Sequence, residues 1–76
     1  MFFSVWFFYP TERGQEFKYF SWYFSTSDSA ERNARKYAQE NIPNCTKITI
    51  GWSVGGSCKT RTLRKNENGE FRRGRK

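Results

Sequence analysis

The sequence predicts an α+β fold: an antiparallel sheet of four or five strands in the order ββαββ, with one helix packed on one face of the sheet. Short runs rich in aromatic and β-branched residues alternate with a period of two, which is typical of strands. One segment instead repeats its apolar residues with helical spacing, and glycine, asparagine and proline separate the segments. At 76 residues, the chain is the size of a single small domain.

The first strand is expected over residues 2 to 9, which are mostly aromatic and form too short a run for a typical helix. Both of its faces are apolar, with Phe3, Val5, Phe7 and Tyr9 on one side and Phe2, Trp6 and Phe8 on the other. Residues 10 to 16 are polar and contain a glycine, so we expect them to form a hairpin loop.

The second strand is expected over residues 17 to 25, and its two faces differ in character. One face carries Lys18, Phe20, Trp22 and Phe24, and the other carries Phe17, Tyr19, Ser21 and Tyr23. The first is the stronger core candidate, because a tyrosine can bury its ring while its hydroxyl stays in water.

The polar residues 25 to 28 supply N-cap candidates, so a helix should begin there, and Asp28 with Glu31 resembles a capping box. Its apolar stripe consists of Ala30, Ala34, Tyr37 and Ala38, and its other positions are mostly charged. Glu31 and Arg35 are expected to form an ordinary solvated pair on the helix surface. Small alanines let a helix lie close to bulky neighbours, so the stripe should meet the aromatic face of the second strand. Asn41 and Pro43 should end the helix.

The third strand has the clearest alternation in the chain, with Ile48, Ile50, Trp52 and Val54 on one face and Lys47, Thr49, Gly51 and Ser53 on the other. Its pairing with the fourth strand depends on the length of the glycine turn that follows Val54. A two-residue loop pairs Trp52 with Lys59 and Ile50 with Arg61, which places charges on the apolar face. A three-residue loop pairs Val54 with Cys58, Trp52 with Thr60 and Ile50 with Thr62, and leaves Lys59, Arg61 and Leu63 outside. We prefer the second register on this ground.

The C-terminal part has its own turn, because Asn68-Gly69 is a common type I′ sequence. A short strand through residues 70 to 72 could return from it, with Phe71 as its anchor. We therefore divide the chain into a core domain, residues 1–65, and a basic C-terminal hairpin or tail, residues 66–76, that is partly flexible.

Positive charge is concentrated at the C-terminal end. The chain has a net charge of +7, and six of these seven charges fall within residues 58 to 76. Arginine-rich clusters of this kind suit the phosphate backbone of nucleic acids, and they also suit acidic protein surfaces. The candidate binding residues are Lys47, Lys59, Arg61, Arg64, Lys65, Arg72, Arg73, Arg75 and Lys76.

Aromatic residues are concentrated at the opposite end, where 12 of the 15 fall within the first 24 positions. One helix covers only one side of a sheet, so the other side needs a second explanation. The candidate aromatic face is Tyr9, Tyr19 and Tyr23, with Lys47 and Arg61 alongside. It would stack unpaired bases, contact a protein partner, form a homodimer, or be closed over by the returning C-terminal strands.

Catalysis has few candidate groups. The chain has no histidine and a single aspartate, and no pair of glutamates is spaced for acid-base work, so we expect no enzyme, no cofactor, no metal site and no small-molecule substrate. Two cysteines, Cys45 and Cys58, are too few for a secreted disulfide framework, which favours the cytoplasm. The apolar start has no basic region before it and is too short to span a bilayer, so neither a signal peptide nor a membrane span is expected. A membrane-surface role is a third option for a chain rich in aromatic and basic residues, but the basic residues lie on no amphipathic helix with an apolar face, so we expect no membrane partner.

These expectations describe a small basic binding module that engages nucleic acid or a nucleoprotein complex through its Lys/Arg-rich C-terminal region. The alternative is a phage-type inhibitor or adaptor, of the anti-CRISPR or anti-restriction class, that blocks a host nucleic-acid-processing protein by direct contact. Such a protein would act in the host cytoplasm. This alternative is an analogy of size and charge, without a sequence motif.

Overall fold

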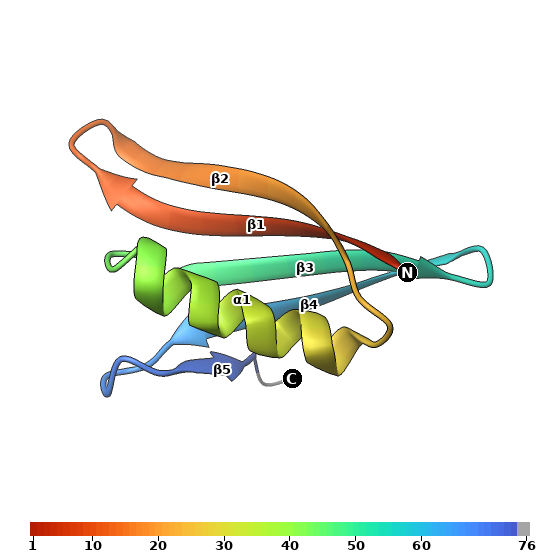
Figure 1. Cartoon of the computed structure of the whole chain (residues 1–76). Coiled ribbons are helices and arrows are strands. Elements are labelled where there is room, and N and C mark those ends of the chain that lie inside the picture. Colours follow the sequence, from red (N-terminus) through yellow and green to blue (C-terminus); the bar gives the residue numbers. More distant parts are fainter. Residues whose placement is uncertain (75–76) are drawn as a thin grey trace.

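The computed structural model describes residues 1–74 and contains five strands and one helix (Figure 1). In chain order they are β1 Phe2–Thr11, β2 Gly14–Tyr23, α1 Ser27–Asn41, β3 Lys47–Val54, β4 Ser57–Lys65 and β5 Phe71–Arg73. The α+β class is confirmed, and the order is ββαβββ instead of ββαββ, because the chain returns after β4 to add a third strand to the C-terminal half.

All five strands form one antiparallel sheet in the order β2-β1-β3-β4-β5. The helix α1 lies across one face of this sheet, in front of it in the view of Figure 1. The β1–β2 hairpin is longer than expected, because its strands pair as far as Thr11 and Gly14 and leave only Glu12 and Arg13 in the loop. The expected loop over residues 10 to 16 is therefore wrong at both ends.

The core lies between α1 and the sheet. Phe3, Val5 and Phe7 of β1 are completely buried against the helix, which confirms the alternation expected for this strand. The alanine stripe is also confirmed, since Ala30, Ala34 and Ala38 have no exposed surface. Because alanine side chains are small, α1 can lie close to the sheet, and the large rings of β2 pack against the side of the helix.

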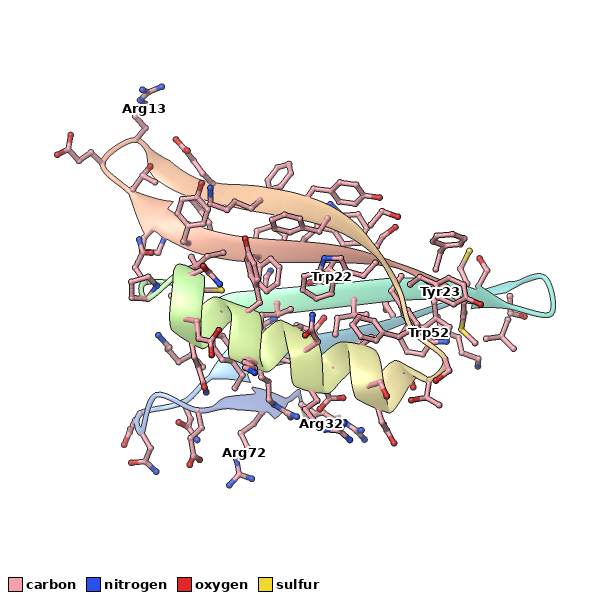
Figure 2. The ribbon with its side chains drawn as sticks, in the orientation of Figure 1. Arg13, Trp22, Tyr23, Arg32, Trp52 and Arg72 are labelled. Carbon is pink, nitrogen blue, oxygen red and sulfur yellow. The ribbon has the colours of Figure 1, made fainter. Side chains whose placement is uncertain are left out.

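The aromatic face of β2 packs beside the helix as expected. The Phe20 and Trp22 rings lie 5.1 and 5.8 Å from the Tyr37 ring of α1, between centroids. Phe24, just after β2, also packs against the core, and Trp22 lies on the α1 side of the sheet (Figure 2). Such ring pairs contribute about 0.5 to 1.5 kcal/mol each beyond their burial, which offsets the small side chains of the helix.

The helix is capped within the expected run of N-cap candidates, residues 25 to 28, but two residues before Asp28. Its N-cap is Thr26, whose hydroxyl oxygen accepts a 3.1 Å hydrogen bond from the backbone N–H of Ser29. Asp28 and Glu31 therefore do not form the expected capping box, and both carboxylates turn to arginines of the sheet instead. The expected end is confirmed, since α1 stops at Asn41.

The β3–β4 pairing has the register that we did not prefer. Gly55 and Gly56 have φ angles of 55° and 83°, as a two-residue type I′ turn requires, and Ile50 consequently faces Arg61. Leu63, which the preferred register left outside, is completely buried. The charge that argued against this register is accommodated because Arg61 finds a carboxylate partner on α1.

The β4–β5 connection also differs in turn type. Gly69 has a φ of 82° and donates its N–H to the carbonyl of Asn66, while no non-glycine residue in the described part has a positive φ, so the turn is not type I′ at Asn68-Gly69. The returning strand itself is confirmed. Phe71 is 3% exposed, and its carbonyl accepts a 2.9 Å hydrogen bond from Nε of Arg35.

Candidate functional site

The face of the sheet opposite α1, which we call the open face, carries large exposed rings. Phe2, Phe17, Tyr19 and Tyr23 are between 50% and 70% exposed. No element of residues 1–74 lies over them, because α1 covers the other face and all the strands belong to the sheet. Of the alternatives for covering this face, closure by the returning C-terminal strands is wrong, since β4 and β5 extend the sheet sideways.

The rings of the open face are arranged in pairs across β1 and β2. The pairs are Phe2 with Tyr23 at 5.0 Å, Trp6 with Tyr19 at 5.3 Å, and Phe8 with Phe17 at 5.9 Å between ring centroids. We call these six residues the aromatic ladder. It arises from the strand period of two, because each pair consists of directly opposed positions in the β1–β2 register.

One line of directly opposed residues crosses the whole open face. It contains Phe17, Phe8, Lys47, Arg64 and Arg72, one from each strand in the spatial order β2-β1-β3-β4-β5. We call this line the cross-sheet row. Its first two members are aromatic and its last three are cationic, and Nζ of Lys47 lies 4.6 Å from the centre of the Phe8 ring, where the two halves meet.

The three cations of the cross-sheet row have little compensation from the protein. Lys47 faces Arg64, and Arg64 faces Arg72, although directly opposed like charges destabilise a sheet. Within residues 1–74, Lys47 and Arg64 make no salt bridge, and Arg72 meets only Glu70 at 3.8 Å, with both side chains mostly exposed. Figure 2 shows Arg72 projecting away from the edge of the sheet. An anion at this position would therefore find charge that the fold leaves available.

Other expected binding residues are instead engaged on the helix side. Glu31 is 3% exposed, and its carboxylate accepts hydrogen bonds from Arg61 at 2.8 Å and from Arg73 at 3.1 Å, and pairs with Arg35 at 2.6 Å. Asp28 contacts Arg61 and Arg73 at 3.4 and 3.3 Å. We call these five residues the Glu31 cluster. The expectation that Glu31 is a solvated surface charge is wrong, because three guanidinium groups on α1, β4 and β5 converge on it.

The remaining expected cations fall in three places. Lys65 donates to the carbonyl of Pro43 at 2.9 Å on the helix side, and Lys59 faces Trp52, so its position also belongs to that side. Arg75 and Lys76 lie outside the described residues. Of the nine expected cations, the strand register thus assigns Lys47, Arg64 and Arg72 to positions of the open face, with Arg72 on the edge strand β5.

The expected aromatic face needs one correction. Tyr19 and Tyr23 lie on the open face, but Tyr9 packs against the core on the helix side, where strand alternation places it with Phe7. Arg61 likewise lies on the helix side and not beside these tyrosines. The prediction grouped tyrosines by their chemistry, and it missed Trp6, Phe8 and Phe17, which the period of two already places on the face of Tyr19.

The rest of the described chain offers little for other chemistry. Residues 1–74 contain no group of three or more histidine, cysteine or acidic side chains arranged to hold a metal ion. Their only helix is too short and too polar to cross a membrane. No protein-family model, curated protein or solved structure matches the chain.

Proposed function

We propose that the protein binds single-stranded nucleic acid on its open face. The observation that carries this proposal is the cross-sheet row, in which the Phe17 and Phe8 rings are followed on the same face by three cations that the fold leaves largely uncompensated. The sequence alone predicted binding through the whole basic C-terminal segment. The structure-based proposal places the contact with phosphates on three cations, Lys47, Arg64 and Arg72.

Each half of the open face has a role in this proposal. The aromatic ladder would stack bases, because every base has a π face and stacking on a protein ring is worth about 1 to 3 kcal/mol per base. The cations would contact phosphates, with Arg64 and Arg72 able to present two N–H groups to one phosphate and Lys47 acting as a point charge. Lys47 lies beside Phe8, so a nucleic-acid strand whose bases stack on the rings of β1 would have a phosphate within reach of Lys47.

The geometry favours single strands over duplex. Stacking on the ladder requires a free base face, and a duplex keeps its base faces inside the helix. Phosphate contacts alone would attract both forms. A preference for single strands therefore tests the aromatic half of the site, and the salt dependence tests the cationic half.

The binding is proposed to be stoichiometric, without catalysis. The chain contains no histidine, and its single aspartate, Asp28, belongs to the Glu31 cluster on the helix side. No strand position of the open face among residues 1–74 holds an aspartate or a glutamate, so the proposed site suits binding and not acid-base chemistry.

Fluorescence anisotropy with labelled single-stranded DNA, single-stranded RNA and the matching duplexes tests the proposal. We expect tighter binding of single strands, and a plot of log affinity against log salt with a slope of about −2 or steeper, since each of three phosphate contacts contributes about −0.7. A flat salt response, or equal affinity for duplex and single strand, would contradict it.

A second candidate is a protein partner, favoured by the exposure of Phe2 and Tyr23, which are 70% and 66% exposed. Aromatic residues and arginine are enriched in protein interfaces and their energetic centres. A stable complex with one protein that survives nuclease treatment and is lost on Tyr23→Ala would favour this alternative. A complex released by nuclease would favour the first proposal.

A further inference from the structure

The open face contains a hollow of about 490 Å³ at the end away from Lys47, Arg64 and Arg72, and Lys59 is among the residues that line it. Six of its lining residues are Phe2, Ser4, Trp6, Gly51, Ser53 and Thr60. Its volume lies in the range of about 300 to 1,000 Å³ that is usual for small-ligand sites. It is thus large enough for one flat ring system, with aromatic side chains at its border.

The hollow exists because small residues occupy the positions between two rings. On β1, Phe2, Ser4 and Trp6 alternate onto the open face, so the two rings are separated by about 13 Å, or four residues at 3.3 Å each. Gly51 lies directly opposite Ser4 and also opposite Thr60. A Cβ atom at Gly51 would point toward the Trp6 ring, 3.6 Å away, and so into the hollow.

We propose that this hollow receives one unpaired base of the bound strand, and this inference rests on the proposed function. The base would lie beside the Trp6 ring, in the part of the hollow that the Trp6 and Thr60 side chains leave open next to Gly51. Since a base must leave its duplex to enter, the hollow would be a source of the preference for single strands.

The position of the hollow fits a strand that also contacts the cations. Lys47 and Gly51 belong to the same strand and the same face, four residues apart, which corresponds to about 13 Å. A short stretch of backbone can therefore place a phosphate at Lys47 and a base over Gly51. The positive charge of Lys47 suits a phosphate, and the ring-sized space next to Gly51 suits a base. A single-stranded nucleic acid carries both groups at this spacing.

The polar groups around the hollow suit any base. The hydroxyls of Ser4, Ser53 and Thr60 can each donate or accept, so they can meet the edge of a purine or a pyrimidine. Ser4 already shares a 3.1 Å hydrogen bond with the Tyr19 hydroxyl, which links the hollow to the aromatic ladder. We expect the hollow to take a base without strong sequence preference.

Filling the hollow gives the test. Gly51 does not have a positive φ, and a Cβ there meets its neighbours at ordinary contact distances, so Gly51→Ala should fold. A larger change is Gly51→Val, which adds two methyl groups beyond that Cβ, beside the Trp6 ring. Its affinity for a single-stranded oligonucleotide should fall about 5- to 140-fold, equivalent to one base stack of about 1 to 3 kcal/mol. The salt slope should stay unchanged, because no phosphate contact is removed.

A set of oligonucleotides, each with one abasic nucleotide at a different position, shows which base enters the hollow. The wild-type protein should bind one of these oligonucleotides more weakly than the intact one, by the same factor. The Gly51→Val variant should bind that oligonucleotide and the intact one with equal affinity. Gly51→Ala, with a smaller group, should give an intermediate result and replaces the valine variant if that variant fails to fold.

The two proposals fail differently. Identical abasic profiles in wild type and variant would overturn the base hollow while single-strand binding stands. Absence of any single-strand binding by the wild-type protein would overturn both.

Discussion

Arg61 on β4 donates a 2.8 Å hydrogen bond from Nη1 to Oε1 of Glu31 on α1, 30 positions earlier in the chain. The same guanidinium lies 5.4 Å from the centre of the Trp52 ring, so one side chain combines an ion pair with a cation-π contact. This contact explains how β4 can place a charge on the helix side of the sheet. It also separates the basic residues into those that hold the fold together and those that remain available.

Replacing Glu31 by glutamine should destabilise the protein. The buried carboxylate has three arginine partners, and the neutral amide would leave their charges without it. We expect a loss of about 1 to 3 kcal/mol in the free energy of unfolding, below the full cost of a broken buried pair because the arginines are partly exposed. Urea unfolding measures it. Glu40→Gln, an exposed position of the same helix, should change stability by less than about 0.5 kcal/mol, and equal effects of the two would contradict the role of the Glu31 cluster.

Replacing Arg64 by alanine should weaken binding without weakening the fold. The slope of log affinity against log salt should become shallower by about 0.7, the contribution of one phosphate contact to a single strand. Stability should rise by a few tenths of a kcal/mol, to about 1, because Arg64 faces like charges on both neighbouring strands. Anisotropy titrations at several salt concentrations and urea unfolding measure the two effects.

The matched control is Arg32→Ala, an exposed cation on α1 that lies on the other side of the molecule from the open face (Figure 2). It removes the same charge from the protein and should leave most of the salt slope intact. An equal loss from Arg32→Ala and Arg64→Ala would mean that net charge, and not the cross-sheet row, governs binding.

Replacing Trp6 by alanine should reduce the affinity for single strands by about 5- to 140-fold, since it removes one stacking surface worth about 1 to 3 kcal/mol. Trp6→Phe keeps a ring beside Tyr19 and should retain most of the affinity. Anisotropy titrations compare the two variants, with circular dichroism as the check on folding. Equal losses from both variants would show that the indole is needed for something other than stacking.

The two cysteines should react at very different rates. Cys58 is exposed, whereas Cys45 is buried, and this burial raises the pKa of the Cys45 thiol. A raised pKa leaves less of the reactive thiolate at any pH near neutrality, so Cys45 should react later and at higher pH than an ordinary thiol. Iodoacetamide labelling followed by mass spectrometry should find one adduct, on Cys58, in the native protein and two in denaturant. Equal native labelling would contradict the buried position of Cys45.

An adduct on Cys58 should also interfere with binding, because this residue borders the hollow over Gly51. Labelling with a bulky maleimide is expected to lower the affinity for an intact oligonucleotide and to have little effect on one with an abasic nucleotide at the sensitive position. Cys58→Ser provides the control, since it keeps a small polar side chain and should be insensitive to the reagent. Unchanged affinity after complete labelling would speak against a base in the hollow.

Local pattern predicted much of this architecture. The period of two assigned the residues of β1 and β3 to their faces, the alanine stripe identified the buried side of α1, and Phe71 marked the anchor of β5. These features depend on the geometry of one element at a time. A strand turns successive side chains to opposite faces, and a helix repeats about every 3.6 residues, whatever the rest of the chain does.

The relations between elements were decided by the tertiary structure. The register of β4, the burial of Glu31 and the choice of Lys47, Arg64 and Arg72 as the exposed cations all depend on residues far apart in the chain. A charge on an apolar face appears unfavourable in one strand alone, but it is stabilised once a carboxylate from another element meets it. By itself, the sequence determined the faces of its elements and the excess of rings and positive charge. Folding determined which rings and charges share a surface, because pairing partners distant in sequence neutralise some charges and leave others exposed.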